Sequence, residues 1–182
     1  IHVSSLIRCI ALETGVLDAK WAEDLSLVDV REITDPESIL RISIGLAWDE
    51  WYAKQFDWIV PHPGEMQLDG IYMTHDGESL DVVRSVRDLQ TRSVLALHEF
   101  KATYKSVNTV WRPDLGWAQS LDSQWMWLTQ CMAYCKALGT TIAYLHVLFL
   151  CGDYTWPQRP RLGPIEGEFN CWRIEFPQSL ID

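Results

Sequence analysis

Two runs of alternating apolar and polar residues carry the acids and the base that could do chemistry in this chain. Asp69 lies in the first run, residues 66–74, and Glu99 and Lys101 lie near the end of the second, residues 93–104. Residues i and i+2 of a strand project to one face, so Glu99 and Lys101 are predicted to lie side by side. If the two runs pair, Asp69 joins them. Carboxylate oxygens bind Mg²⁺, and an ammonium beside them favours phosphodiester hydrolysis.

Two further segments place polar residues among apolar ones. Gln130 lies in the apolar segment 123–138, and Tyr134 follows it by about one helical turn. A buried amide needs hydrogen-bond partners, so Gln130 is expected to face a polar site. Upstream, Glu50 flanks an apolar stripe in the segment 36–56 and can point toward the same site. The stripe consists of Leu40, Ile44, Ala47 and Trp51.

Asp69 followed by Glu99-x-Lys101 resembles the signature of the PD-(D/E)xK nuclease superfamily. Asp69 precedes Glu99 by 30 residues, and Leu68 stands where the superfamily's name has proline. The resemblance implies that Asp69 and Glu99 bind Mg²⁺ or Mn²⁺ together with the backbone carbonyl of Phe100. It also implies that Lys101 orients the attacking water, or helps to deprotonate it if the pKa of the lysine is lowered.

The two helical segments are similar to those of the lambda-exonuclease-like and RecB-like branches of this superfamily. The resemblance extends over roughly residues 41–151. It implies that Glu50 completes a second metal position and that Gln130 hydrogen-bonds the lysine or the substrate phosphate. The spacing from Gly45 to Glu50 is one residue longer than the version expected most often, so Asp49 competes with Glu50. We expect Glu50 to take the role.

These assignments predict a Mg²⁺- or Mn²⁺-dependent deoxyribonuclease, either an exonuclease or a recombination or repair nuclease. The candidate substrate contacts are Lys105, Arg112 and Tyr134, and the lambda-exonuclease-like branch suggests a homo-oligomeric ring. Two alternatives remain: a non-catalytic nucleic-acid-binding or assembly module on the same fold, and a chance match of the motif. The net charge of −10 and the ten tryptophans favour the module, whereas the complete set of two acids and a lysine favours catalysis.

The composition is that of a globular protein of one domain, residues 1–182, with 48% apolar and 22% charged residues. An acidic chain does not coat DNA through a broad basic surface, so any contact with DNA must be local and metal-assisted. The five cysteines are scattered without a CxxC pair, which predicts reduced thiols in an intracellular, cytoplasmic protein. No segment approaches the ~20 apolar residues that a membrane span needs.

The pattern of elements predicts an α/β fold with a central mixed sheet of four or five strands flanked by helices, which the resemblance implies to be a restriction-endonuclease-like core. Helices are expected at residues 36–56 and 123–138, the second closed by Gly139. His75-Asp76-Gly77 is expected to form a hairpin turn. Further strands are predicted at residues 141–151, in the centre of the sheet, and 168–176, at its edge.

Overall fold

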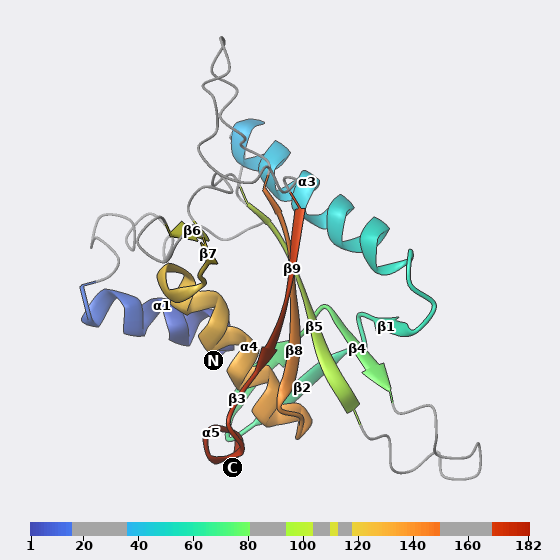
Figure 1. Ribbon diagram of the computed structural model, residues 1–182. Helices are drawn as coiled ribbons and strands as arrows, with labels where there is room; N and C mark the ends of the chain where they lie inside the picture. The colour runs from blue at the N-terminus through green and yellow to red at the C-terminus, as the bar shows by residue number, and fades with distance from the viewer. Residues whose placement is uncertain (16–35, 81–93, 104–109, 113–117, 150–168) are drawn as a thin grey trace.

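The computed structural model describes residues 1–15, 36–80, 94–103, 110–112, 118–149 and 169–182. These residues form a single α/β domain built on a mixed sheet of five strands (Figure 1). The predicted fold class is confirmed. The strands follow the order β1 (Ile59–Pro61), β4 (Gly77–Leu80), β5 (Val94–Thr103), β8 (Ile142–Phe149) and β9 (Phe169–Glu175).

The long central strands β5 and β8 are parallel, and the other neighbours in this sheet are antiparallel. Parallel neighbours need a crossover connection, which contains helix α4 (Trp125–Leu138). Gly139 ends α4 in the left-handed conformation with φ 70°, as its C-cap position predicts. Strand β9 lies at the edge of the sheet and β8 inside it, so both predicted positions are confirmed.

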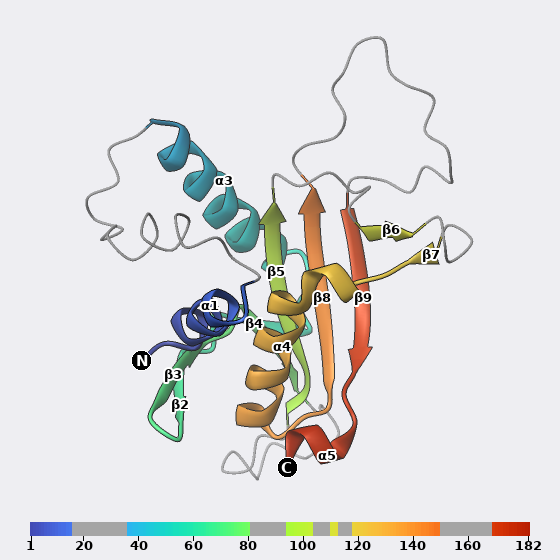
Figure 2. The same cartoon turned by 90° about the vertical axis from the view of Figure 1, so that its left-hand side faces the viewer.

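Helices cover both faces of the sheet (Figure 2). On the face that we call the α4 face, Cys131 and Tyr134 of α4 belong to one core cluster with Leu97 and Leu145 of the strands. Helix α1 (Val3–Glu13) packs beside α4 on this side. On the opposite face, the α3 face, helix α3 (Pro36–Ala53) packs against β5, and Ala53 joins a second cluster with Ile59 and Phe100.

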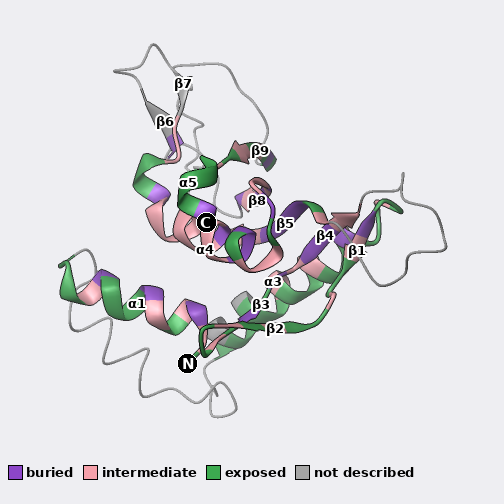
Figure 3. Ribbon diagram, turned by 90° about the horizontal axis from the view of Figure 1, so that it is seen from below, coloured by how far each residue is buried: buried purple, intermediate pink, exposed green. Residues whose placement is uncertain are grey.

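The predicted apolar stripe of α3 does not face the sheet. Leu40, Ala47 and Trp51 are exposed, whereas Tyr52 and Ala53 contact the sheet at the end of the helix. Figure 3 shows buried residues along β4, β5 and β8, while α3 is largely exposed. The orientation of α3 is therefore set by its last turn.

The predicted strand at residues 66–74 is a hairpin of two short strands, β2 (Glu65–Leu68) and β3 (Ile71–Thr74). Asp69 and Gly70 form its turn, with φ values of 50° and 80°. Positive φ at both central residues is the geometry of a type I′ turn, for which Asp-Gly is a preferred sequence. The hairpin is a two-stranded sheet of its own, separate from the central sheet.

The prediction of a hairpin turn at residues 75–77 is wrong. The hairpin turn lies at Asp69-Gly70 instead. Gly77 begins β4, paired with Pro61 on one side and His98 on the other. A Cβ at Gly77 would lie 2.8 Å from Cγ2 of Ile59, so glycine allows β1 to approach β4.

The remaining described elements are short. Strands β6 (Trp111–Arg112) and β7 (Ala118–Gln119) pair with each other, and a 3₁₀ turn at Asp122–Gln124 precedes α4. Helix α5 (Gln178–Ile181) lies near the C-terminal end of the chain. None of the helices in the described part of the chain is long and apolar enough to cross a membrane.

Candidate functional site

Asp76 and Glu99 face each other across two paired strands. Gly77 pairs with His98, so one residue further along the register Asp76 lies opposite Glu99. The backbone N–H of Phe100 donates a hydrogen bond to Oδ2 of Asp76 at 2.7 Å, which fixes the carboxylate at the start of β4. Residues directly opposite on antiparallel strands have Cβ atoms about 5 Å apart. The acid beside Glu99 is therefore Asp76.

The predicted place of Asp69 in this site is wrong. Asp69 is exposed in the turn between β2 and β3, and these strands pair with each other and not with β5. Two Asp-Gly pairs occur within nine residues, and only the second leads into the central sheet. Asp76 precedes Glu99 by 23 residues. The repeated Asp-Gly was the one signal that could have identified it.

Glu99 and Lys101 form an ion pair on the α4 face, so their predicted side-by-side position is confirmed. Burial, opposed by the charge of Lys101 and assisted by the carboxylates of Asp76 and Asp49, raises the pKa of Glu99 to about 8. Lys101 shows the opposite balance. Burial lowers the pKa of the lysine, but the charges of Glu99 and Asp76 outweigh burial and hold that pKa above its ordinary range.

A lysine with a raised pKa remains an ammonium at neutral pH. It can donate hydrogen bonds and neutralise negative charge, but it cannot take a proton from water. Of the two roles predicted for Lys101, deprotonation of the water does not fit a raised pKa, and orientation of the water stays a prediction.

Asp49, and not Glu50, faces the site from α3. Burial raises the pKa of Asp49 to about 6, followed by the charge of Asp76, whereas His62 and Lys101 lower it. Glu50 is exposed and pairs with Lys54 at 2.7 Å. Neighbouring helical residues point about 100° apart, so only one of the two acids can turn inward. The expectation for Glu50 was wrong because it relied on the apolar stripe, which faces solvent.

Gln130 and Tyr134 form a hydrogen-bonded pair on α4. Nε2 of Gln130 donates to the hydroxyl oxygen of Tyr134 at 2.8 Å, and not to Lys101 as predicted. Tyr134 is fully buried, and its pKa is raised by burial and then by the nearby charge of Glu99. Tyr134 thus closes the inner side of the site. Its buried position does not fit the predicted role of a substrate contact.

Three predicted residues remain to be placed. Phe100 gives its N–H to Asp76, and its ring packs on the α3 face. Arg112 lies in β6, but its side chain is outside the described part of the chain. Lys105 falls outside the described residues altogether.

The charges and the unpaired oxygens of the site fit a divalent cation. Three carboxylates, on Asp49, Asp76 and Glu99, interact with the single ammonium of Lys101. Oε2 of Glu99 and Oδ1 of Asp49 are buried without a hydrogen-bond partner. Such acceptor oxygens are costly to bury unless a cation or a donor satisfies them.

The described carboxylates of the site do not form a closed cage for a metal ion. Among the described residues, no three His, Cys, Asp or Glu side chains are arranged to hold an ion together. Mg²⁺ usually keeps several waters and binds through one or two carboxylates and a substrate phosphate. Asp76 and Glu99 can supply those carboxylates, with Asp49 at the margin.

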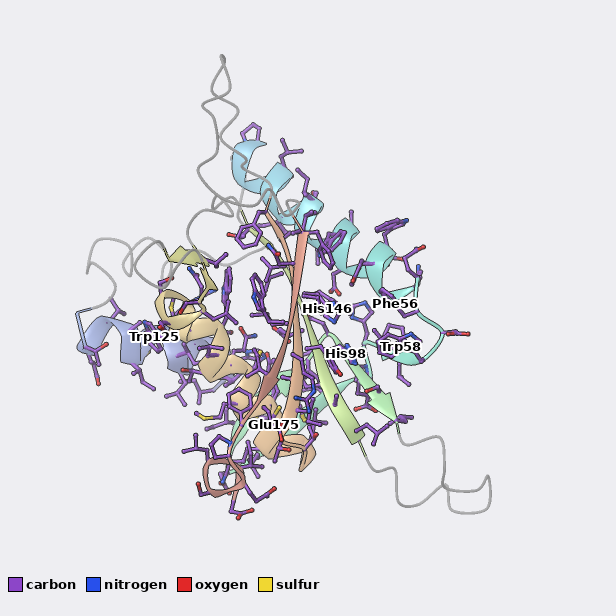
Figure 4. The ribbon with its side chains drawn as sticks, viewed as in Figure 1. Phe56, Trp58, His98, Trp125, His146 and Glu175 are labelled. Carbon is purple, nitrogen blue, oxygen red and sulfur yellow. The ribbon has the colours of Figure 1, made fainter. Side chains whose placement is uncertain are left out.

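A second cluster, which the sequence did not indicate, lies on the α3 face. Nδ1 of His98 lies 3.0 Å from Nε2 of His146, and the Tyr52 hydroxyl lies 3.3 Å from Nδ1 of His146. Trp58 packs edge-on against His98 (Figure 4). These contacts join α3, the residue before β1, β5 and β8, and they hold Tyr52 in the last turn of α3, three residues after Asp49.

No family model matches this chain, and no curated protein sequence matches it. Among solved structures, the chain is similar to the crystal structure of SSO0001, with a TM-score of 0.47 and 11% sequence identity. That comparison covers 100% of this chain and 71% of SSO0001.

Proposed function

We propose that this protein is a Mg²⁺- or Mn²⁺-dependent phosphodiester hydrolase that acts on DNA. The observation that carries the proposal is the convergence of Asp76, Glu99 and Lys101 on two paired strands, with one buried oxygen of Glu99 unpaired. The choice of DNA follows the resemblance to PD-(D/E)xK nucleases. In that resemblance, Asp76 takes the place that the sequence first gave to Asp69.

The chain's own residues supply three functions in this reaction. Asp76 and Glu99 would hold the cation, which would polarise the phosphate and lower the pKa of a bound water. The Lys101 ammonium neutralises the negative charge that develops on the phosphorus oxygens during attack. The Gln130–Tyr134 pair excludes water from the inner side of Glu99, where burial strengthens each electrostatic interaction.

The test is cleavage of linear and circular DNA, each single- and double-stranded, with Mg²⁺ or Mn²⁺. Asp76→Asn and Glu99→Gln should each lower the rate by at least about a hundredfold, because each removes a carboxylate that would hold the cation. Asp69→Asn and Glu50→Gln are matched controls that make the same chemical change outside the site. Both controls should cleave at the parental rate. Asn also tolerates the left-handed conformation at position 69.

The substrate forms separate the possible kinds of enzyme. Degradation of linear but not circular DNA would identify an exonuclease, whereas cleavage of circular DNA would identify an endonuclease. Binding of DNA without cleavage in either metal would instead identify a non-catalytic module and overturn the proposal. Loss of activity in Asp69→Asn with full activity in Asp76→Asn would reject the site as assigned.

A further inference from the structure

His62 has a strained backbone that no turn explains. Among the residues that the structure describes, two non-glycine residues have positive φ, Asp69 at 50° and His62 at 45°. Asp69 occupies a hairpin turn that requires this geometry. His62 lies between Pro61 and Pro63, and a following proline further restricts the backbone of the residue before it. Such conformations cost of order 1 kcal/mol or more and cluster at functional sites.

The strain places His62 beside the acids of the candidate site. Its backbone N–H donates to the carbonyl oxygen of Asp76 at 2.9 Å, which extends the pairing of β1 with β4 by one residue. His62 and Asp76 therefore occupy neighbouring backbone positions just beyond the paired ends of β1 and β4, next to Glu99 of β5. Nδ1 of His62 also lies 4.0 Å from Oδ2 of Asp49. The imidazole is thus held between two elements that carry carboxylates of the site.

Exposure increases from the interior of the site toward His62. The side chain of Glu99 is 1% exposed, those of Asp49 and Lys101 are 19% and 22% exposed, and that of His62 is 51% exposed. Tyr134 closes the opposite, inner side. Among the described residues of the site, His62 is therefore the one that an incoming phosphodiester can reach most easily.

The geometry points to His62 as a substrate-binding residue whose imidazole N–H donates a hydrogen bond to a non-bridging oxygen of the scissile phosphodiester. The assignment rests on the proposed hydrolase function. An imidazole has an N–H donor in its neutral and in its charged form, so the contact does not depend on protonation. The strained backbone fixes the ring at the entrance instead of leaving it free on a flexible loop.

A structural role must be distinguished from a contact with substrate. If the ring only held Asp49 in place, its removal would weaken metal binding. If the ring contacts the phosphate, its removal weakens productive binding of DNA and leaves metal binding unchanged. Metal affinity and cleavage kinetics therefore separate the two roles.

His62→Gly and His62→Asn are the informative variants. Glycine adopts φ near 45° without strain, which offsets its entropic cost, so the variant should unfold at the parental temperature or above. Its kcat/KM for DNA should fall about ten- to a hundredfold, as expected for one lost hydrogen bond to the reacting phosphate. Its Mn²⁺ affinity should stay at the parental value. Asparagine accepts the same backbone conformation, offers an N–H donor, and should recover part of the rate.

Each outcome has one reading. A parent protein that does not cleave DNA overturns the proposed function and this inference together. A parent that cleaves, with His62→Gly at the same kcat/KM, overturns the role of His62 alone. A parallel loss of Mn²⁺ affinity in His62→Gly would show that the ring positions Asp49, and would also overturn the substrate contact. A selective loss of kcat/KM with partial recovery in His62→Asn supports it.

Discussion

Divalent metal should bind this protein more tightly at pH 8 than at pH 6. A carboxylate must lose its proton before it binds a cation, so metal affinity depends on the pKa of each ligand. Burial raises the pKa of Glu99 to about 8 from an ordinary value of 4.5. Burial raises the pKa of Asp49 to about 6 from 3.8. Both groups therefore lose their protons in the range where nucleases are usually assayed.

The size of the effect follows from the ionised fraction of Glu99. With a pKa of about 8, roughly 1% of Glu99 is ionised at pH 6 and about half at pH 8. The apparent dissociation constant for Mn²⁺ should therefore fall by about fiftyfold across this range, equivalent to roughly 2 kcal/mol. Asp49 adds a factor of about two if it contributes a ligand.

Thermal unfolding at pH 6, 7 and 8 over a series of Mn²⁺ concentrations would measure this change. The ten tryptophans provide an intrinsic fluorescence signal, and calorimetric titration would give the affinity directly. The Glu99→Gln variant should lose most of the stabilisation by metal. The stabilisation that remains should not depend on pH. Glu50→Gln, the matched control on the exposed side of α3, should keep both.

Equal affinity at pH 6 and pH 8 in the parent would refute the reasoning. It would mean that Glu99 is either not a ligand or not buried as described. If Glu99→Gln still binds metal with an unchanged pH dependence, the metal site must lie elsewhere in the chain.

Two further predictions concern the elements around the site. Gln130→Leu should lower the free energy of unfolding by about 1 to 3 kcal/mol in urea titrations, because it leaves the buried hydroxyl of Tyr134 unpaired, whereas Tyr134→Phe in the same background should restore part of the loss. Burial lowers the pKa of His146 to about 4, so as pH falls below about 6.5 this histidine binds a proton in the unfolded chain before it does in the folded protein. The stability advantage of the parent over His146→Gln should therefore shrink by about 2 kcal/mol from pH 7 to pH 5. An advantage that is independent of pH would exclude a buried neutral His146. Comparison with the variant removes the opposite contribution of Glu99, whose raised pKa makes stability fall as pH rises from about 4.5 to 8.

The sequence was informative wherever a local period determines the structure. The alternation of residues 93–104 placed Glu99 and Lys101 on one face, and the glycine after the apolar segment 123–138 placed the end of α4. Both features depend only on residues within the same element. They therefore survive any arrangement of the rest of the chain.

The errors arose where two local signals were equivalent and tertiary contacts decided between them. Asp69-Gly70 and Asp76-Gly77 have equal turn propensity, but only Gly77 lies where a Cβ would collide with Ile59 of a neighbouring strand. The first pair became the turn and the second entered the sheet. The choice depends on a contact with β1 that alternation and turn propensity do not reveal.

The choice between Asp49 and Glu50 has the same origin but involves the other face of β5. Tyr52 lies three residues after Asp49, on the same side of α3, and its ring contacts Phe100 and His146 with ring centres 5.4 Å from each. These aromatic contacts fix the rotation of the last turn of α3. Asp49 therefore turns toward the acids without forming a close ion pair with Lys101 in the described structure. Strand β5 carries both halves of this arrangement, because Glu99 and Lys101 face α4 while Phe100 and His98 hold α3. The packing of α3 on its face of β5 thus determines that Asp49, and not Glu50, turns toward Asp76 and Lys101.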